Sequence, residues 1–466
     1  MKISNLSRRS FIQGSGLVLA GTAAGSVLPW LPSSASAADS VFAPNVYLSI
    51  ATDGQVTIVA HRSEMGQGIR TALTQILADE LDAQWSRTSV EQATGDKKYG
   101  DQNTDGSKSI RLFYDVLRHA GASAREMLVS VAARRWGVVV TECTVAEHRV
   151  SHAASGRSFD FGELASDAAA LPVPAKVEFK PRQEQRFIGK PMKNIDAPQV
   201  VQGGANFGAD VVLDNMVHAV VVRCPHLGGK AEKFHGPEGQ PGFLGLEAFD
   251  PPAQASLFLP KGGVAVIADS TWHAVKYAQS LQVAWSDSDA LAFDSDAFQA
   301  ELREMVQQPA KVVYDRGNVD KTLEQGVSQL EATYETPFLA HAPMEPPVAL
   351  ASVHDGVCEV WAPVQDPQDT RTWVARWLKL PEEKITINVT MLGGAFGRKS
   401  KPDFVLEAVE LSRRLQRPVR VTWRREDDIQ HDYYHAASAQ YHRASLDADG
   451  RPLAWLQRTA FPTISS

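Results

Sequence analysis

The segment from Lys384 to Lys399, KITINVTMLGGAFGRK, constrains the fold more than any other part of the chain. Apolar and polar residues alternate from Ile385 to Met391, which is the period of a half-buried strand. Three glycines then interrupt the pattern, and residues 403–415 have the apolar spacing of a helix. The segment therefore predicts a strand, a glycine-rich loop and a helix in succession. Such a loop brings backbone N–H groups and a helix N-terminus close to a bound anion.

The loop does not have the spacing of an ATP-binding P-loop. Gly393 and Gly397 are four residues apart, and Arg398 precedes Lys399 where that motif requires Gly-Lys-Ser/Thr. ATP hydrolysis is therefore disfavoured. Taken by itself, a glycine-rich turn between a strand and a helix is more often an ordinary packing turn than a cofactor loop, so other motifs must decide.

A second glycine-rich loop, EMGQG, lies near the N-terminus at Glu64 to Gly68. Residues Val46 to Ala60 before it have the pattern of a hairpin with a turn at Thr52-Asp53-Gly54, and Thr71 to Leu81 after it have helical spacing. This loop too is expected between a strand and a helix. The Gln67 amide can donate and accept hydrogen bonds, which suits an oxo group or a heterocycle edge, although a solvent-facing glutamine fits as well.

A third motif, AHAPMEP at Ala340 to Pro346, makes the set recognisable. Together the three motifs resemble the molybdopterin-binding large subunit of the xanthine dehydrogenase family of molybdenum hydroxylases. They are most similar to the branch of the isoquinoline 1-oxidoreductase beta subunit and periplasmic aldehyde dehydrogenases. In that branch the MGQG segment precedes the other two motifs, as it does here. Further matches at 203–230 and 263–285 extend the resemblance over most of the chain.

The resemblance implies a multidomain α+β (mixed α/β) protein. We expect an N-terminal molybdopterin-binding segment at residues 38–200, which carries MGQG. A smaller α+β domain like the family's "hammerhead" domain is expected at 201–290, and the first molybdopterin-binding domain at 291–466. A proline-containing connector near residues 172–191 and the Gly/Pro turns of 203–285 agree with this division.

The family also implies site residues. Backbone amides and side chains of the three loops would hold the pterin and its pyrophosphate, and no protein side chain would bind the metal. The residues expected at the cofactor are Gly66, Gln67, Gly68, Gln365, Gly393, Gly394, Ala395, Phe396, Gly397 and Arg398.

A substrate pocket is implied at His341, Glu345 and Tyr434. Prolines flank His341 and Glu345, so the two residues cannot form a metal pair on one helical face. Glu345 is expected to face the substrate; the alternative is that it only hydrogen-bonds nearby backbone. Xanthine-oxidising members place an arginine near Tyr434, where this chain has aromatic residues, so purines are not expected substrates.

The cofactor implied is molybdenum–molybdopterin, in the cytosine dinucleotide form common in bacterial relatives. Cys143, Cys224 and Cys358 are far apart and odd in number, which excludes an iron–sulfur site in this chain. The implied partners are a small subunit with two [2Fe–2S] clusters and a cytochrome c subunit. The implied reaction oxidises an aldehyde or an N-heterocycle with oxygen taken from water.

The first 37 residues resemble a twin-arginine signal peptide, with SRRSFI at Ser7 to Ile12, a weakly apolar stretch and an A-x-A site ending at Ala37. Export of a folded protein to the periplasm follows. Retention of residues 11–31 as a membrane anchor is the alternative, but several Gly, Ser and Thr residues make that segment a poor span. The net charge of −7 does not favour nucleic acid as a partner.

The family's catalytic base is a glutamate in a C-terminal GxGE-type segment, and no such motif occurs in the 466 residues. The catalytic residue therefore stays unassigned. Three alternatives are open: a fragment, a subunit that a second polypeptide completes, or a pseudoenzyme. The rival function is accordingly a truncated, non-catalytic chain that binds the cofactor or a partner.

Overall fold

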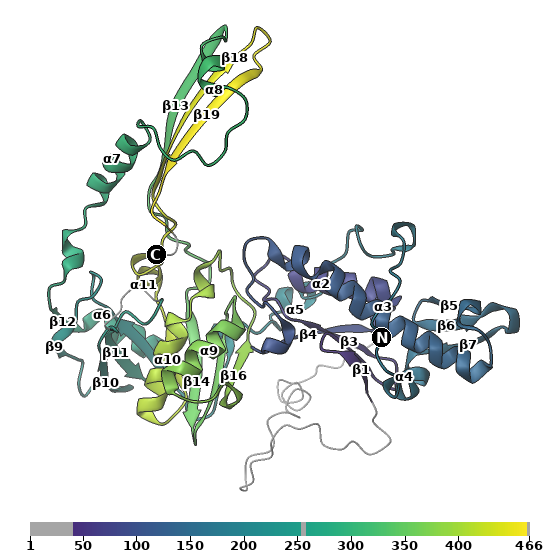
Figure 1. The fold of residues 1–466 in the computed structure, drawn as a ribbon. Helices are drawn as coiled ribbons and strands as arrows, with labels where there is room; N and C mark the ends of the chain where they lie inside the picture. The colour runs from purple at the N-terminus through teal and green to yellow at the C-terminus, as the bar shows by residue number, and fades with distance from the viewer. Residues whose placement is uncertain (1–40, 253–257, 464–466) are drawn as a thin grey trace.

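The computed structural model describes residues 41–252 and 258–463. The predicted signal peptide therefore lies outside the described residues. Within the described ranges, no helix is both long and apolar enough to span a membrane. The fold consists of an N-terminal lobe, a central sheet and a projecting arm (Figure 1).

The N-terminal lobe has one core, built on a sheet of order β1-β2-β3-β4. Its strands are β1 (Phe42–Asn45), β2 (Leu48–Ile50), β3 (Val56–Ala60) and β4 (Thr88–Gln92). Three helices bury their apolar faces in this core: α2 (Ile69–Leu81), α3 (Lys108–Trp136) and α4 (Phe161–Ala169). A small sheet of β5 (Cys143–Ala146), β6 (Arg149–His152) and β7 (Arg157–Asp160) completes the lobe. The predicted hairpin and the helix after MGQG are confirmed.

The central sheet has seven strands in the order β10-β11-β8-β17-β14-β15-β16. Their bounds are β8 (Val217–Val222), β10 (Phe243–Phe249), β11 (Gly263–Ala268), β14 (Val348–His354), β15 (Val357–Ala362), β16 (Ile385–Val389) and β17 (Val419–Thr422). Helices α9 (Pro367–Leu378) and α10 (Asp403–Leu415) pack on one face. Helix α6 (Thr271–Ser280) covers the other face at β8 and β11, because alternate residues of a strand point to opposite sides.

The pairing of β8 with β17 is parallel and joins segments about 200 residues apart. The sheet therefore runs across the expected domain boundary at residue 290, and the boundary itself stays a prediction. A separate pair, β9 (Ala231–His235) and β12 (Gln282–Trp285), lies beside the sheet. The mixed α+β class expected from the sequence is confirmed by these sheets and helices.

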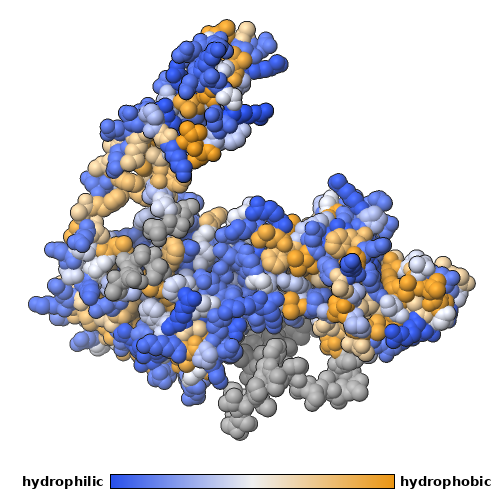
Figure 2. Space-filling model, viewed as in Figure 1, coloured by the Kyte–Doolittle hydropathy of each residue, from blue (hydrophilic) through white to orange (hydrophobic). Residues whose placement is uncertain are grey.

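The arm is a three-stranded sheet that stands away from the rest of the molecule (Figures 1 and 2). Its order is β13-β18-β19, from β13 (Ser328–Thr336), β18 (Ser438–Leu446) and β19 (Pro452–Ala460). Helices α7 (Ser295–Met305) and α8 (Val319–Leu323) pack against it, and two short helices elsewhere are α5 (Ala197–Val201) and α11 (Arg425–Gln430). β18 and β19 form a hairpin whose turn is closed by the Gly450 N–H, which donates to the Asp447 carbonyl at 3.1 Å.

Candidate cofactor site

The two glycine-rich loops meet where the N-terminal lobe contacts the central sheet. The backbone N–H of Leu392 donates to the carbonyl of Glu64 at 3.0 Å. Gln365 lies in the connection between β15 and α9 and links the glycine-rich loop at residues 393–397 to the segment before α3. Its Oε1 accepts from the Gly397 N–H at 3.0 Å, and its Nε2 donates to the Thr104 carbonyl at 2.8 Å. These bonds hold three segments that are far apart in sequence at fixed positions relative to one another.

A cavity of about 640 Å³ lies between these segments. Its wall includes Gln67, Gly68, Gln365, Phe396 and Gly397 from the predicted cofactor set. The remaining wall comes from Met65, Ile69, Ala72, Thr104, Asp105, Gly106, Ser107, Ser109 and Ile110. The structure therefore brings the MGQG and GGAFGR loops to one site, as the sequence analysis expected, and adds the segment before α3.

Glu64 organises the MGQG loop, a role the sequence analysis missed. Its carboxylate accepts from the backbone N–H groups of Gly66, Gly68 and Arg70 at 2.9, 2.8 and 3.1 Å. The N-terminus of α2 is therefore satisfied by a carboxylate of the chain itself. Gln67 also bonds within the loop, to the Met65 N–H and the Ser63 carbonyl. The sequence feature that could have predicted this role is an acidic residue directly before a glycine-rich loop that leads into a helix.

The N-terminus of α3 differs, because its first N–H, that of Lys108, donates to the Asp105 carbonyl at 3.0 Å and no carboxylate side chain caps it among the described residues. The N-cap Ser107 makes no side-chain cap bond, and the first turn of α3 contains no acidic residue. Gly106 and Ser107 have positive φ angles of 52° and 56° and line the cavity with Ser109. The N-terminus of a 29-residue helix thus lies at the cavity with Ser107 and Ser109 in the wall, which is a favourable place for a phosphate. The run DGSKS before a long helical pattern was a signal the sequence analysis did not use.

The expectation of an anion site at α10 needs a correction. Asp403 occupies the first turn of α10, and the Arg398 guanidinium donates to both of its carboxylate oxygens at 2.9 and 2.8 Å. Arg398 Nε also lies 3.2 Å from Asp432, and the side chain is fully buried. A direct contact between Arg398 and a cofactor is therefore not what the structure shows; the guanidinium holds the loop against α10.

Glu345 is engaged with backbone and with a lysine. Its carboxylate accepts from the Gly208 and Gly393 N–H groups, each at 3.0 Å, and from Lys399 Nζ at 2.8 Å. This matches the alternative of a backbone-bonding glutamate. A Cβ atom at position 393 would lie 2.6 Å from Glu345 Cβ, so the close approach requires glycine.

The rest of the GGAFGR loop has unusual backbone geometry. Gly394 and Gly397 have φ angles of 85° and 114°, and Phe396, which is not a glycine, has 57°. Left-handed φ at a bulky residue is strained, and such strain concentrates at functional sites. Phe396 is 66% exposed and lines the cavity, whereas Ala395 is buried beneath it.

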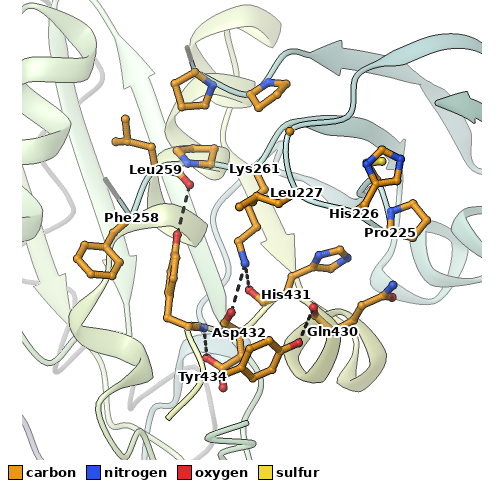
Figure 3. Close-up of a pocket in the computed structure, with 16 residues that line it drawn as sticks. Pro225, His226, Leu227, Phe258, Leu259, Lys261, Gln430, His431, Asp432 and Tyr434 are labelled. Carbon is orange, nitrogen blue, oxygen red and sulfur yellow. Dashed lines mark hydrogen bonds between the residues drawn. The ribbon is translucent and has the colours of Figure 1, made fainter. Parts of the chain in front are cut away.

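The predicted substrate residues do not share one cavity. His341 lies behind the GGAFGR loop, where its Nδ1 contacts Asp432 at 2.9 Å. Tyr434 lines a different cavity of about 390 Å³, whose lining residues include none of those around the first cavity (Figure 3). The role of these residues toward a substrate stays a prediction.

Arg62 provides a test of whether the first cavity fits an anionic cofactor. The side chain is fully buried, and its Nη1 donates to the carbonyl of Asn103, next to the cavity wall at Thr104. Among the described residues, its Nε has no hydrogen-bond partner, and its Nη2 has only the Asp101 carboxylate, at 3.5 Å. Unpartnered buried donors are costly, so a guanidinium left in this state is suited to a phosphate-bearing ligand. The residues present fit such a group.

Together, the fold and the site define a cofactor-binding subunit with two glycine-rich loops around one cavity. Two family descriptions, both "Molybdopterin cofactor-binding domain", match residues 304–459 and 8–220. The chain belongs to the molybdopterin cofactor-binding proteins of the xanthine dehydrogenase family, as its motifs predicted.

Two relatives are similar over nearly the whole chain. A membrane-bound aldehyde dehydrogenase [pyrroloquinoline-quinone] of Gluconacetobacter polyoxogenes is 32% identical over 96% of this chain and 59% of its own length. Isoquinoline 1-oxidoreductase subunit beta of Brevundimonas diminuta is 31% identical over 96% of this chain and 63% of its own. The chain thus spans about 60% of the length of these relatives. The names of both relatives describe oxidoreductases. The name of the first includes pyrroloquinoline-quinone, a cofactor other than molybdopterin.

Among solved structures, reconstituted CO dehydrogenase from Oligotropha carboxidovorans has a TM-score of 0.45 and 19% identity, covering 58% of this chain and 39% of that one.

Proposed function

We propose that the chain is the molybdopterin-binding large subunit of a periplasmic molybdenum hydroxylase that oxidises aldehydes or N-heteroaromatic compounds. The observation that carries the proposal is the single cavity formed by the MGQG loop, the GGAFGR loop and the N-terminus of α3. The names of the two relatives support an aldehyde or an N-heterocycle as the substrate class.

Each part of the cavity has its own task in binding the cofactor. The α3 N-terminus with Ser107 and Ser109 would hold a phosphate, with Arg62 behind it as a second donor. The backbone beside Gln67 and Phe396 would hold the pterin, and Gln365 keeps the two loops at their separation. We assign the bacterial cytosine dinucleotide form. When bound, the molybdenum group supplies the two-electron oxidation, with oxygen taken from water.

Electron transfer is assigned to partners: a small iron–sulfur subunit and a cytochrome c. The three cysteines are free, and burial raises the pKa of the Cys358 thiol to about 12. Among the described residues, no group of three or more His, Cys, Asp and Glu side chains could hold a metal ion. The leader with its paired arginines supports export by the twin-arginine route.

A second candidate is a chain that binds the cofactor or a partner without turnover. One observation favours it: the carboxylates of Glu64 and Glu345 at the two loops are held by backbone N–H groups, so neither is free to act as a base. Under the first proposal, the proton-accepting glutamate comes from a polypeptide segment other than these two residues.

Analysis of the purified protein with whatever co-purifies tests the proposal. Molybdenum, iron and cytosine nucleotide would be measured per polypeptide, and aldehyde and isoquinoline oxidation assayed with a dye as electron acceptor. About one molybdenum and one cytosine nucleotide per chain, with iron from a co-purifying subunit, is the expected result. Cofactor without turnover would favour the second candidate, and a chain free of molybdenum under conditions that load a related enzyme would contradict both.

A further inference from the structure

The second cavity, of about 390 Å³, lies between residues 224–228 after β8, the residues before β11 and the end of α11. Most of its exposed lining is apolar, with Leu227, Leu259 and Tyr434 among the side chains that face it (Figure 3). It shares no lining residue with the cofactor cavity, so its contents can be considered separately.

Lys261 is the one lysine in the lining of this cavity. Its Nζ donates to the backbone carbonyls of His431 and Asp432, the latter at 3.4 Å. Among the residues that the structure describes, no carboxylate lies within salt-bridge distance of this nitrogen. Its stem packs against Tyr433, with Nζ 4.7 Å from the ring centroid. The ammonium group thus has two carbonyl acceptors and a cation–π contact, but no carboxylate as a counter-ion at salt-bridge distance among the described residues.

The charged groups nearest to Lys261 are already paired with one another. Asp403 and Asp432 bond or contact Arg398, and Arg223 is paired with Glu407 at 2.5 Å.

The imidazoles of the lining add no second charge that competes for a ligand. Burial lowers the pKa of His431 to about 3, so this imidazole is neutral, and His226 Nδ1 contacts Ser288 Oγ at 3.0 Å. Burial also lowers the pKa of Lys261 to about 8, against the opposing effect of the Asp403 and Asp432 carboxylates.

We infer that this cavity binds an organic carboxylate, whose carboxylate group pairs with Lys261 Nζ and whose apolar body lies against Leu227, Leu259 and Tyr434. An unpaired ammonium in an apolar cavity gains a charge-assisted hydrogen bond from such a ligand, while the ligand's body loses contact with water. The site requires no cofactor. If aldehydes are the substrates, their oxidation products belong to the same ligand class.

Titration calorimetry with benzoate tests the inference on the full chain. Because the free amine is about half protonated near pH 8 and the bound one fully protonated, binding should take up roughly half a proton at pH 8 and almost none at pH 6. Comparing two buffers of different ionisation enthalpy measures that number. Benzamide, which has the same size and no charge, should bind at least about tenfold more weakly. Absence of benzoate binding at 10 mM, or equal affinity for benzoate and benzamide, would overturn the inference.

Two lysine variants locate the site. Lys261→Met keeps an apolar stem and removes the charge, and should weaken benzoate binding at least about tenfold, whereas Lys384→Met on the exposed surface should not change it. Equal affinity in wild type and Lys261→Met would refute the assignment. If Lys261→Met fails to fold, the preference of the wild type for benzoate over benzamide decides. Neither measurement depends on molybdenum, so failure of the proposed function would leave this result unaffected.

Discussion

Asp366 is a helix cap whose burial opposes its charge. Its carboxylate accepts from the Asp369 N–H at 3.1 Å at the start of α9, and burial raises its pKa to about 6. The folded state therefore holds this proton more tightly than the unfolded chain does, so the free energy of unfolding falls as pH rises from about 4 to about 6. Asparagine keeps the capping oxygen without the charge. Asp366→Asn should therefore raise the free energy of unfolding at pH 7.5 by about 2 kcal/mol and leave it unchanged at pH 4.

Urea unfolding of wild type and Asp366→Asn at the two pH values measures this difference. Asp449→Asn, at a side chain that is 75% exposed, is the matched control and should have no effect at either pH. A gain of the same size at pH 4 and pH 7.5 would show that the effect of the substitution does not depend on the ionisation of Asp366. That result would contradict the raised pKa.

Glu64 is the residue on which the MGQG loop depends. Glu64→Ala removes the acceptor for three backbone N–H groups and should lower the free energy of unfolding by about 3 kcal/mol, at about 1 kcal/mol for each bond. The loop should also lose its shape, so molybdenum content per chain should fall. Glu91→Ala, at an exposed position of β4, should change neither quantity by a measurable amount. A stable Glu64→Ala protein with full molybdenum would show that the carboxylate does not hold the loop.

The residues of the site could be predicted to different degrees. Gln67, Phe396 and Gly397 belong to short glycine-rich motifs, and the resemblance of these motifs to the family placed them at one cofactor site, whereas local spacing predicted only loops between a strand and a helix. Arg398 and Glu345 could not be placed, because their environment depends on Asp432 and Lys399, which lie 34 and 54 residues away and contact them only after folding. Charge partners at such distances leave no periodic signal in the sequence.

At the scale of elements, long periodic helices were predictable and strand partners were not. The helical patterns at 71–81 and 403–415 agree with α2 and α10 within two residues, because a buried face repeats along the whole segment. β18 pairs with β19 on one side and with β13 on the other, and the β13 partner lies about 100 residues earlier in the chain, where no local pattern marks it. The parallel β8–β17 pairing has no local signal at all.

The β8–β17 contact is reinforced by a buried cluster between elements. Arg223, directly after β8, donates to Glu407 of α10 at 3.0 Å, and Trp423, directly after β17, donates to the same carboxylate at 2.8 Å. The guanidinium also lies 3.7 Å from the Trp423 ring centroid. Removing one partner leaves a buried charge without a counter-ion, so Arg223→Met should lower the free energy of unfolding by about 3–5 kcal/mol.

A double variant distinguishes charge from packing in this cluster. Arg223→Met combined with Glu407→Leu removes both charges and should recover at least half of the loss, because two apolar side chains of similar size replace the pair. Denaturant unfolding of the two single variants and the double variant gives the coupling energy. Additive losses would show that the pair contributes only through the volume of its side chains.

At the scale of the whole molecule, the three parts have cores of very different size. The N-terminal lobe and the central sheet each have an extensive buried cluster, whereas the cluster of the arm is small, with Leu302, Val306, Ala437, Ala439 and Tyr441. One face of the arm sheet carries Leu330, Tyr334 and Trp455, which are 60%, 60% and 58% exposed. His442 lies between the two aromatic rings, at centroid distances of 5.7 and 5.8 Å. The arm therefore has less buried apolar area to stabilise it than the sheet from which it projects.

Hydrogen exchange should make this difference visible. β18 and β14 are both inner strands, paired on each side, so their backbone amides are bonded to the same extent. They differ in burial, because β14 lies under α10 in the central core while β18 is in the arm. Local opening requires less free energy where less apolar surface is exposed by it, so β18 amides should exchange at least about 100-fold faster than β14 amides. Mass spectrometry of peptides from the two strands, in one sample of the purified chain, provides an internal control. Equal protection of β18 and β14 would show that the arm and the central sheet open as one cooperative unit, with the arm stabilised by contacts beyond its own small core.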